Sequence, residues 1–502
     1  MNKSDITRML DACGYVNDSA ATQIHHYTTV KRKSLTKAQV DNRNSTGWGR
    51  GEYIIAEYDQ NDNCSLNNLI DGWKKLASKY QDQFLVLEVS QNDWRVYDSF
   101  GNELGDNSYI ANLFSFRTDP ETIQKIYFGC PGTGKSYEVN QIIIRHLKAE
   151  FLKFLKKHNL SDSSINKHAG VLEAIRIIDL FRNLNKDIKS IYEITTPSDI
   201  EDIFKDPDFI KIDTTGQSMY SCALKYYINF LSVQTVFRTT FHPDTDYASF
   251  VGCYKPTVAH GTNSITYAFC PQIFTEAYIA AWENPDKNIF LVIEEINRGN
   301  CAQIFGDIFQ LLDRKNGLSE YPVKADKDLA NYLGKRLSVG LRGIANGNLQ
   351  IPPNFNILAT MNTSDQSLFP MDSAFKRRWD WEYIPIDLKC QASNFTIDID
   401  DKKYSWLSFL EKVNDHILRL TESEDKQLGN FFIKKNISKD EFKSKVMFYL
   451  WSEVCKDYYN SDSFFKYNDG HNDIEFTFNM LFSGNDTTIL QGFMKKLDVT
   501  EI

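Results

Sequence analysis

This 502-residue chain contains, at positions 129–136, the sequence Gly129-Cys130-Pro131-Gly132-Thr133-Gly134-Lys135-Ser136. It fits the pattern GxxxxGK[ST], in which glycines allow backbone N–H groups to close around phosphates at the N-terminus of a helix. An apolar segment from Glu121 to Phe128 precedes the glycines, and a helical pattern from about Lys135 towards Leu155 follows them. A chance glycine turn is rarely bracketed in this way. The order strand, loop, helix therefore predicts a phosphate-binding loop in an α/β fold.

Two side chains of this loop have expected roles. Lys135 is placed to neutralise the β- and γ-phosphates of a nucleotide, and Ser136 is placed to bind Mg²⁺ through its hydroxyl. Mg²⁺ prefers octahedral oxygen coordination that is shared between protein, phosphate and water. The loop therefore predicts a nucleoside triphosphate as substrate and Mg²⁺ as cofactor.

A second element ends in two carboxylates. Ile289 to Ile293 is an apolar strand followed by Glu294 and Glu295, as in a Walker B strand. We assign Glu294 to Mg²⁺, and Glu295 to the attacking water as its general base. The usual first residue of the pair is Asp, which is one methylene shorter than Glu294. Taken alone, paired acids after a strand are more often a solvated strand end, but after a P-loop they favour catalysis.

A third buried strand and a basic triplet complete the candidate site. Asn362, in the segment Phe355 to Thr363, occupies the position of a sensor of the γ-phosphate or of the attacking water, the alternative being a strand-end cap. Lys376-Arg377-Arg378 follows late enough to lie at a subunit edge. There Arg377 or Arg378 can reach a neighbour's γ-phosphate as an arginine finger, and the sequence does not choose between them. A solvated basic face is the alternative.

The composition indicates a folded protein of several domains. A chain of 502 residues is too long for one hydrophobic core, so about three domains are expected. The formal charge of −9 excludes a uniformly basic nucleic-acid coat but not a local basic face. Nine cysteines occur without a CxxC pair or a Cys/His ligand spacing, which predicts reduced thiols and no structural zinc. The sequence has no signal-peptide h-region and no apolar run near ~20 residues, so we expect a cytoplasmic protein without membrane contact.

Pattern changes divide the chain into three parts. Residues 1–120 alternate short β-like runs (53–58, 84–89 and 94–97) with polar turns, which predicts a separate small α+β domain. Residues 121–390 alternate strands and helix-length segments, as in a parallel sheet flanked by helices, with a helical insertion at about 150–231. Residues 391–502 are predicted to form a helical lid and C-terminal region. One of its helices opens on a capping box of Ser438 and Glu441.

Several strings together resemble one family, the McrB-like AAA+ motor subunits of modification-dependent restriction systems. The strings are Phe241-His242-Pro243 with Tyr247 and Phe250, Glu294-Glu295-Ile296-Asn297-Arg298, Met361-Asn362-Thr363-Ser364-Asp365-Gln366-Ser367, and Asp372 to Arg378. The resemblance extends from about residue 121 to 390. The Glu-Ile-Asn-Arg and Met-Asn-Thr-x-Asp strings are more specific than a P-loop, so they separate this chain from a generic AAA+ protein.

The resemblance implies how such a protein works. It implies a homo-oligomeric, hexameric ring that hydrolyses GTP and works with a McrC-type endonuclease subunit to translocate on and cut DNA, as an anti-phage restriction system. Asn297 and Arg298 are expected where the active site meets a partner or neighbour, and Asp365 is expected near the nucleotide. Glu294 in place of Asp, Gln366 where Arg is common, and the size of the insertion depart from the family pattern. GTP and ATP therefore both remain open as substrates.

The N-terminal part lies where this family carries a variable target-recognition domain. A basic cluster there could hold phosphate and, with Trp48, stack a base. Its members are Lys31, Arg32, Lys33, Lys37, Arg43 and Arg50. A solvated surface is the commoner role of such a charge run, and a protein partner is an equal alternative. The sequence carries no nuclease constellation. Two other functions stay open: a MoxR-like or dynein-related ATPase that remodels a protein, and a nucleotide-gated nucleic-acid sensor.

Overall fold

The computed structural model describes residues 122–502 apart from 159, 185–187, 259–264, 338–341, 366–368, 370 and 457–463. It also describes the backbone of three N-terminal strands, β1 (Leu85–Ser90), β2 (Asp93–Tyr97) and β3 (Glu103–Gly105), which pair as an antiparallel sheet. β1 and β2 confirm the runs predicted at 84–89 and 94–97. The predicted run at 53–58 and the basic cluster of residues 31–50 lie outside the described residues.

A five-stranded parallel sheet forms the centre of the molecule. Its strand order is β14-β4-β13-β8-β5, and every neighbouring pair is parallel. The bounds are β14 Asp380–Tyr383, β4 Gln124–Gly129, β13 Phe355–Asn362, β8 Ile289–Glu294 and β5 Val236–Thr240. β8 and β13 are buried along almost their whole length, as expected for strands covered on both faces. The predicted α/β class is confirmed, and the edge strand β14 is an addition to the strands predicted.

Helices cover both faces of this sheet. On one face α6 (Lys135–Lys157) packs through Val139 and Ile143 against side chains such as Tyr127 of β4. On the other face α13 (Ile273–Glu283) packs against Ile126 and its neighbours in β8 and β13. Three shorter helices join this second face, α12 (Tyr247–Phe250), α14 (Cys301–Phe305) and α15 (Lys327–Arg336). α6 runs directly out of the P-loop, as its sequence predicted.

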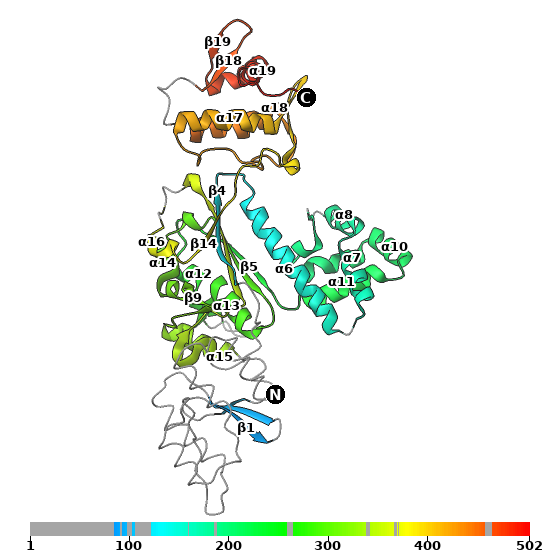
Figure 1. The fold of residues 1–502 in the computed structure, drawn as a ribbon, viewed down its shortest axis with the longest axis vertical. Helices are drawn as coiled ribbons and strands as arrows, with labels where there is room; N and C mark the ends of the chain where they lie inside the picture. The colour runs from blue at the N-terminus through cyan, green and yellow to red at the C-terminus, as the bar shows by residue number, and fades with distance from the viewer. Residues whose placement is uncertain are drawn as a thin grey trace, which may run out of the picture.

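The predicted insertion is a separate group of helices beside the sheet. Its helices are α7 (Asp162–Leu172), α8 (Ile175–Asn183), α9 (Ser198–Glu201), α10 (Pro207–Thr215) and α11 (Met219–Phe230). They pack on the second half of α6, where Phe151 meets the rings of Tyr192, Tyr227 and Phe230. Figure 1 shows this group standing to the side of the sheet, connected by α6. Because α6 extends to Lys157, the insertion proper begins after the predicted boundary.

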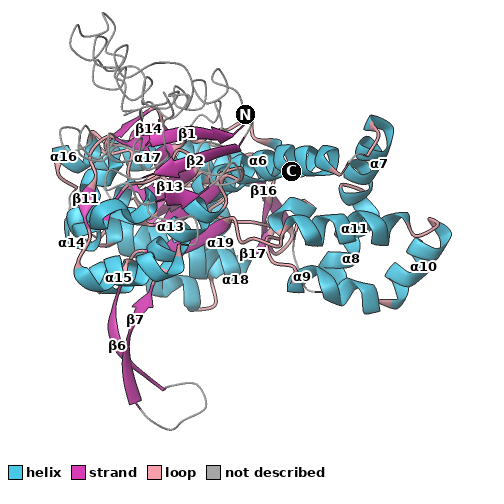
Figure 2. Cartoon of the chain, turned by 90° about the horizontal axis from the view of Figure 1, so that it is seen from below, coloured by secondary structure: helices cyan, strands magenta, loops and turns pink. Residues whose placement is uncertain are grey.

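A β-hairpin projects from the sheet domain. It consists of β6 (Gly252–Val258) and β7 (Ile265–Pro271), which pair antiparallel between α12 and α13. Figure 2 shows it extending away from the helices that surround its base. Tyr254 and Tyr267 are exposed on it. The sequence patterns did not predict this hairpin.

The C-terminal part has its own core around the fully buried Trp406. It contains the antiparallel strands β15 (Thr396–Ile399) and β16 (Lys402–Ser405), the helix α17 (Trp406–Thr421), and the helix α19 (Asp486–Lys496) packed on β18 (Lys466–Asn468). α18 (Lys439–Glu441) begins at the predicted Ser438/Glu441 capping box and continues as π-helix over Phe442–Met447 and Leu450–Val454. In Figure 1 this part lies above the sheet, next to the end of β4.

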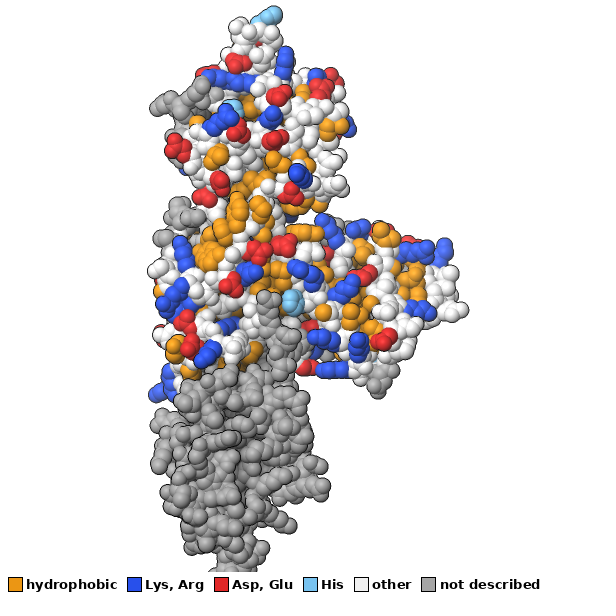
Figure 3. All heavy atoms as spheres, in the orientation of Figure 1, with side chains coloured by type: hydrophobic (Ala, Val, Ile, Leu, Met, Phe, Trp, Pro, Cys, Tyr) orange, Lys and Arg blue, Asp and Glu red, His pale blue; other side chains and the backbone are white. Residues whose placement is uncertain are grey.

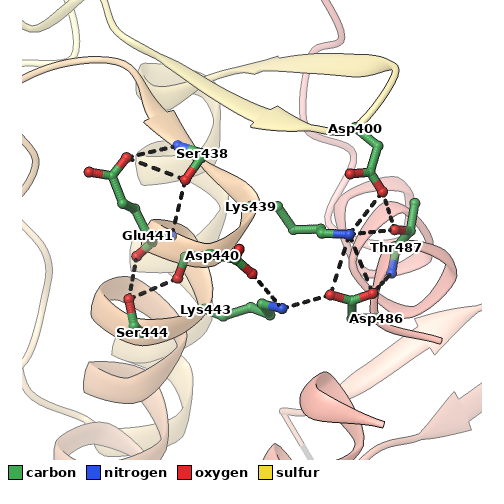
Figure 4. A network of polar contacts seen from close by, with 9 residues as sticks. All are labelled: Asp400, Ser438, Lys439, Asp440, Glu441, Lys443, Ser444, Asp486 and Thr487. Carbon is green, nitrogen blue, oxygen red and sulfur yellow. Dashed lines mark hydrogen bonds and ion pairs between the residues drawn. The ribbon is translucent and has the colours of Figure 1, made fainter. Parts of the chain in front are cut away.

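A polar network joins α18 to α19 inside this C-terminal part (Figure 4). Lys443 donates to Asp486 at 2.6 Å and pairs with Asp440 at 2.8 Å. Lys439 donates to Asp400 and to Thr487, both at 2.9 Å. The network therefore fixes the start of α19 to the rest of this C-terminal part. Across the described part of the chain, no helix combines the length and the apolar character that a membrane crossing requires.

Candidate nucleotide-binding site

The phosphate-binding loop has the backbone geometry that its glycines predicted. Gly132 and Gly134 have φ values of 85° and 95°, which residues other than glycine rarely adopt. No side chain caps the start of α6, so its first N–H groups are available to bind an anion at the helix N-terminus. Lys135 Nζ lies inside the loop and donates to the carbonyls of Gly129 and Cys130, each at 2.9 Å. This arrangement fits a bound phosphate chain.

Glu294 stands at the carboxyl end of β8, opposite the start of α6. Its Oε2 accepts hydrogen bonds from Ser136 Oγ at 2.9 Å and from Thr360 Oγ1 at 2.5 Å. Its Oε1 lies 3.5 Å from Nη1 of Arg238. The hydroxyl of Ser136 and the carboxylate of Glu294 thus meet, as predicted, and these hard oxygen donors suit Mg²⁺.

Glu295 and Asn362 form a second pair at the same edge of the sheet. Asn362 Nδ2 donates to Glu295 Oε1 at 2.6 Å, and Asn297 Nδ2 donates to the carbonyl of Asn362 at 2.9 Å. Glu295 has φ 53° and ψ 48°, a left-handed conformation that turns its side chain away from the line of β8. Its N–H donates to Thr360 Oγ1 at 3.2 Å. The predicted base, sensor and Asn297 are therefore connected in one chain of hydrogen bonds.

The two candidate arginine fingers have different environments. Arg378 donates to Asp313 Oδ2 at 2.6 Å and to the carbonyl of Ala374 at 2.7 Å, and its guanidinium lies 3.8 Å from the ring centroid of Phe309. Its side chain is only 6% exposed. Arg378 therefore packs against residues of its own chain, and its assignment as a possible finger stays a prediction. Arg377 is exposed.

The structure describes the side chain of the predicted Arg298 but not that of the predicted Asp365. Arg298 is exposed, one residue after the buried Asn297. Asp365 belongs by its backbone to the short helix η6 (Thr363–Asp365), but its side chain lies outside what the structure describes, as does Gln366. The predicted place of Asp365 near the nucleotide stays a prediction.

The C-terminal part, which was predicted to form a lid, contacts the P-loop directly. Gly429 N–H donates to the carbonyl of Pro131 at 2.8 Å, and Phe431 N–H donates to the carbonyl of Gly132 at 2.6 Å. A Cβ at position 429 would lie 2.3 Å from the backbone of Gly132 and Thr133, so only glycine fits there. The predicted lid segment, Asp425 to Phe432, therefore binds the phosphate-binding loop through these two backbone hydrogen bonds, which together form the latch. Figure 3 shows hydrophobic side chains gathered at this junction of sheet domain and lid.

A cavity of about 450 Å³ opens beside the P-loop, between the sheet edge and the lid. Its lining residues are Phe128, Cys130, Asn297, Met361, Thr363, Phe369, Met371, Lys376, Trp381, Tyr383, Glu424 and Asp425. Burial raises the pKa of the Cys130 thiol to about 11, so this thiol is neutral and unreactive at neutral pH. Asn297 Oδ1 is buried and accepts no hydrogen bond from the described residues. The cavity therefore offers a ligand aromatic walls, two carboxylates and one amide acceptor.

Some residues of the site were not predicted from the sequence. Arg238 and Thr360 both contact Glu294, and Gly429 contacts the P-loop. Arg238 and Thr360 lie within strands that were predicted, and alternation along those strands could have assigned their side chains to the α6 face. Gly429 is more than 290 residues from the P-loop, and only the folded structure brings the two together.

Comparisons with known proteins agree with this geometry. The family described as AAA domain (dynein-related subfamily) matches residues 215–379, a stretch that begins within the helical insertion and does not include the P-loop. The chain is 37% identical over 260 residues to the Type II restriction enzyme BsuMI component YdiS of Bacillus subtilis (strain 168). That match covers 45% of this chain and 74% of the Bacillus protein.

A second relative is more distant. The chain is 28% identical over 198 residues to the Type IV methyl-directed restriction enzyme EcoKMcrB subunit of Escherichia coli (strain K12). The match covers 39% of this chain and 37% of the E. coli subunit. Together with the parallel sheet, the P-loop and the paired glutamates, these matches show that the chain belongs to the McrB-like AAA+ nucleoside triphosphatases of restriction systems.

Proposed function

We propose that this chain hydrolyses GTP or ATP with Mg²⁺ and drives a restriction complex in which a separate subunit cuts DNA. The observation that carries the proposal is the meeting of Lys135, the Ser136–Glu294 pair and the Glu295–Asn362 pair at one edge of the sheet. These are the groups that bind the phosphates, the cation and the attacking water in phosphoryl transfer.

Each group has a defined task in this reaction. Lys135 and the N–H groups at the start of α6 bind the phosphates, and Ser136 and Glu294 would hold Mg²⁺, which neutralises charge on the phosphate oxygens. Glu295 takes a proton from the attacking water. Asn362 donates to the Glu295 carboxylate at 2.6 Å and so fixes the orientation of the base.

Ring assembly would complete the site. An exposed Arg377 from a neighbouring copy in a hexameric ring is suited to stabilise charge on the γ-phosphate. The relatives, a restriction enzyme component and a methyl-directed restriction subunit, support a McrC-type endonuclease and DNA as partners. They favour a restriction motor over the remodelling ATPase and the sensor, and we extend the proposal to an anti-phage role in the cytoplasm. The N-terminal 120 residues would recognise the DNA target.

Steady-state phosphate release tests the proposal. Purified protein is assayed with GTP and with ATP, each with and without DNA, and Glu295→Gln serves as the matched control. Removal of a general base is expected to reduce turnover by about 10²–10⁴-fold while nucleotide binding is retained. GTP or ATP turnover that DNA stimulates supports the restriction motor, whereas turnover that responds only to a protein partner would favour the remodelling ATPase. Equal rates in the wild type and Glu295→Gln would contradict the site assignment.

A further inference from the structure

Arg238 is a cation at the edge of the nucleotide site to which the mechanism above gives no task. It lies on β5, two residues before the position that pairs with Glu294. Its Nη1 is 3.5 Å from Glu294 Oε1, and its Nη2 donates to Asn140 Oδ1 on α6. The guanidinium therefore bridges the carboxyl end of the sheet and the helix that begins at the P-loop.

The position of Glu294 explains what such a bridge can do. A glutamate has one more rotatable bond than the aspartate usual at this position, so its carboxylate must lose more freedom before it can help to bind a cation. In this structure Ser136 and Thr360 both donate to Oε2, which leaves Oε1 to be held from another direction. Arg238 is the group that faces Oε1.

We propose that Arg238 is a positioning residue that holds Glu294 in the orientation needed for Mg²⁺ and so compensates for the longer side chain. The inference rests on the nucleotide hydrolysis proposed above. The side chains of Arg238 and Glu294 are 41% and 22% exposed, so solvent screens their attraction and charge alone contributes little. The planar guanidinium instead contributes geometry, because one nitrogen faces Glu294 while another is fixed by Asn140.

Cation binding, measured separately from turnover, tests this role. Mn²⁺ is titrated in place of Mg²⁺ and followed by electron paramagnetic resonance, with a non-hydrolysable GTP or ATP analogue bound. Arg238→Gln is expected to weaken Mn²⁺ binding about 10-fold and to raise the Mg²⁺ concentration for half-maximal phosphate release by a similar factor. Arg238→Lys, which keeps the charge but not the fork, should be intermediate.

The same substitution in a Glu294→Asp background provides the matched control. Aspartate is too short to reach Arg238, so Arg238→Gln should then change Mn²⁺ binding by less than about twofold. Equal losses in both backgrounds would overturn the proposal, since Arg238 would then act on the substrate or on the fold. Unchanged Mn²⁺ binding in Arg238→Gln would overturn it as well.

Two further measurements distinguish a loss of this positioning role from a loss of folding and from a failure of the proposed function. Melting temperatures without nucleotide should match the wild type, and if Arg238→Gln does not fold, Arg238→Lys carries the same comparison. A wild type that neither binds nor hydrolyses GTP or ATP would refute the proposed function and, with it, this inference. A wild type that hydrolyses nucleotide, beside an Arg238→Gln variant with unchanged Mn²⁺ binding, would refute this inference alone.

Discussion

Arg377 and Arg378 are neighbours in sequence but differ in environment. Arg377 is exposed on the surface, whereas Arg378 stacks on Phe309 and pairs with Asp313. Because an arginine finger must reach the active site of the next subunit, the exposed Arg377 suits that role better than the packed Arg378. Because their environments differ, we expect removal of the Arg377 guanidinium to affect turnover and removal of the Arg378 guanidinium to affect stability.

Arg377→Ala is expected to reduce phosphate release by about 10³-fold without changing the melting temperature. Mixing Arg377→Ala with Glu295→Gln should restore part of the activity, since some interfaces then combine an intact base with an intact finger. Arg145→Ala removes another exposed arginine, on α6, and should leave the rate unchanged. No recovery on mixing would argue that Arg377 acts within its own chain.

Arg378→Ala is expected to act on stability instead. It leaves Asp313 partly buried without its partner and removes a cation–π contact, which should cost about 3 kcal/mol of unfolding free energy. Denaturant unfolding measures this loss. A variant with wild-type stability and lost turnover would restore Arg378 as a finger.

Among the contacts between elements, the latch couples the predicted lid to the P-loop through two backbone hydrogen bonds. Gly429→Ala places a methyl group 2.3 Å from the backbone of Gly132 and Thr133. Overpacking of this kind costs about 1–3 kcal/mol, so the predicted lid should dock less well and nucleotide affinity should fall about 5- to 150-fold. Titration of a fluorescent nucleotide measures the affinity. Gly334→Ala, in α15 with open space around the added methyl, is the matched control and should bind as the wild type does.

The network between α18 and α19 predicts an acid-sensitive lid. The hydrogen bond from Lys443 is the largest cause that lowers the pKa of Asp486. A carboxyl whose folded pKa is lowered contributes stability above its usual pKa of about 3.9 and loses it as pH falls towards the folded value. The difference in unfolding free energy between wild type and Asp486→Asn should therefore be about 2 kcal/mol at pH 7 and should narrow below about pH 4. Urea unfolding at several pH values checks this, and a difference that does not vary with pH would contradict it.

Across the whole chain, the pattern of neighbouring residues predicted the helices and strands, but it did not predict the contacts between residues far apart in sequence. The P-loop, the start of α6 and the strands β5, β8 and β13 followed from glycine placement and apolar runs, because these signals lie within a few residues of one another. The capping box at Ser438 was confirmed for the same reason.

The features that the sequence left unresolved depend on residues far apart in the chain. β14 is too short and too polar to be predicted as a strand from the sequence. Its strand conformation is recognised only from its pairing with β4. The packing of Arg378 depends on Asp313, and the role of Arg238 depends on the register that brings β5 beside β8. Such pairings arise from tertiary structure rather than from local preference.

The order of the strands in the sheet also determines which parts of the chain can fold first during synthesis. β4 is synthesised early but pairs only with β13 and β14, and Ile123 contacts a residue 233 positions later. At a translation rate of about 5–20 residues per second, this strand waits about 10–50 seconds on the ribosome for its neighbours. During that interval the insertion emerges and covers the apolar side chains of α6, among them Phe151 and Leu155. A nascent chain arrested near residue 330 should thus hold a protease-resistant helical insertion before it can bind any nucleotide.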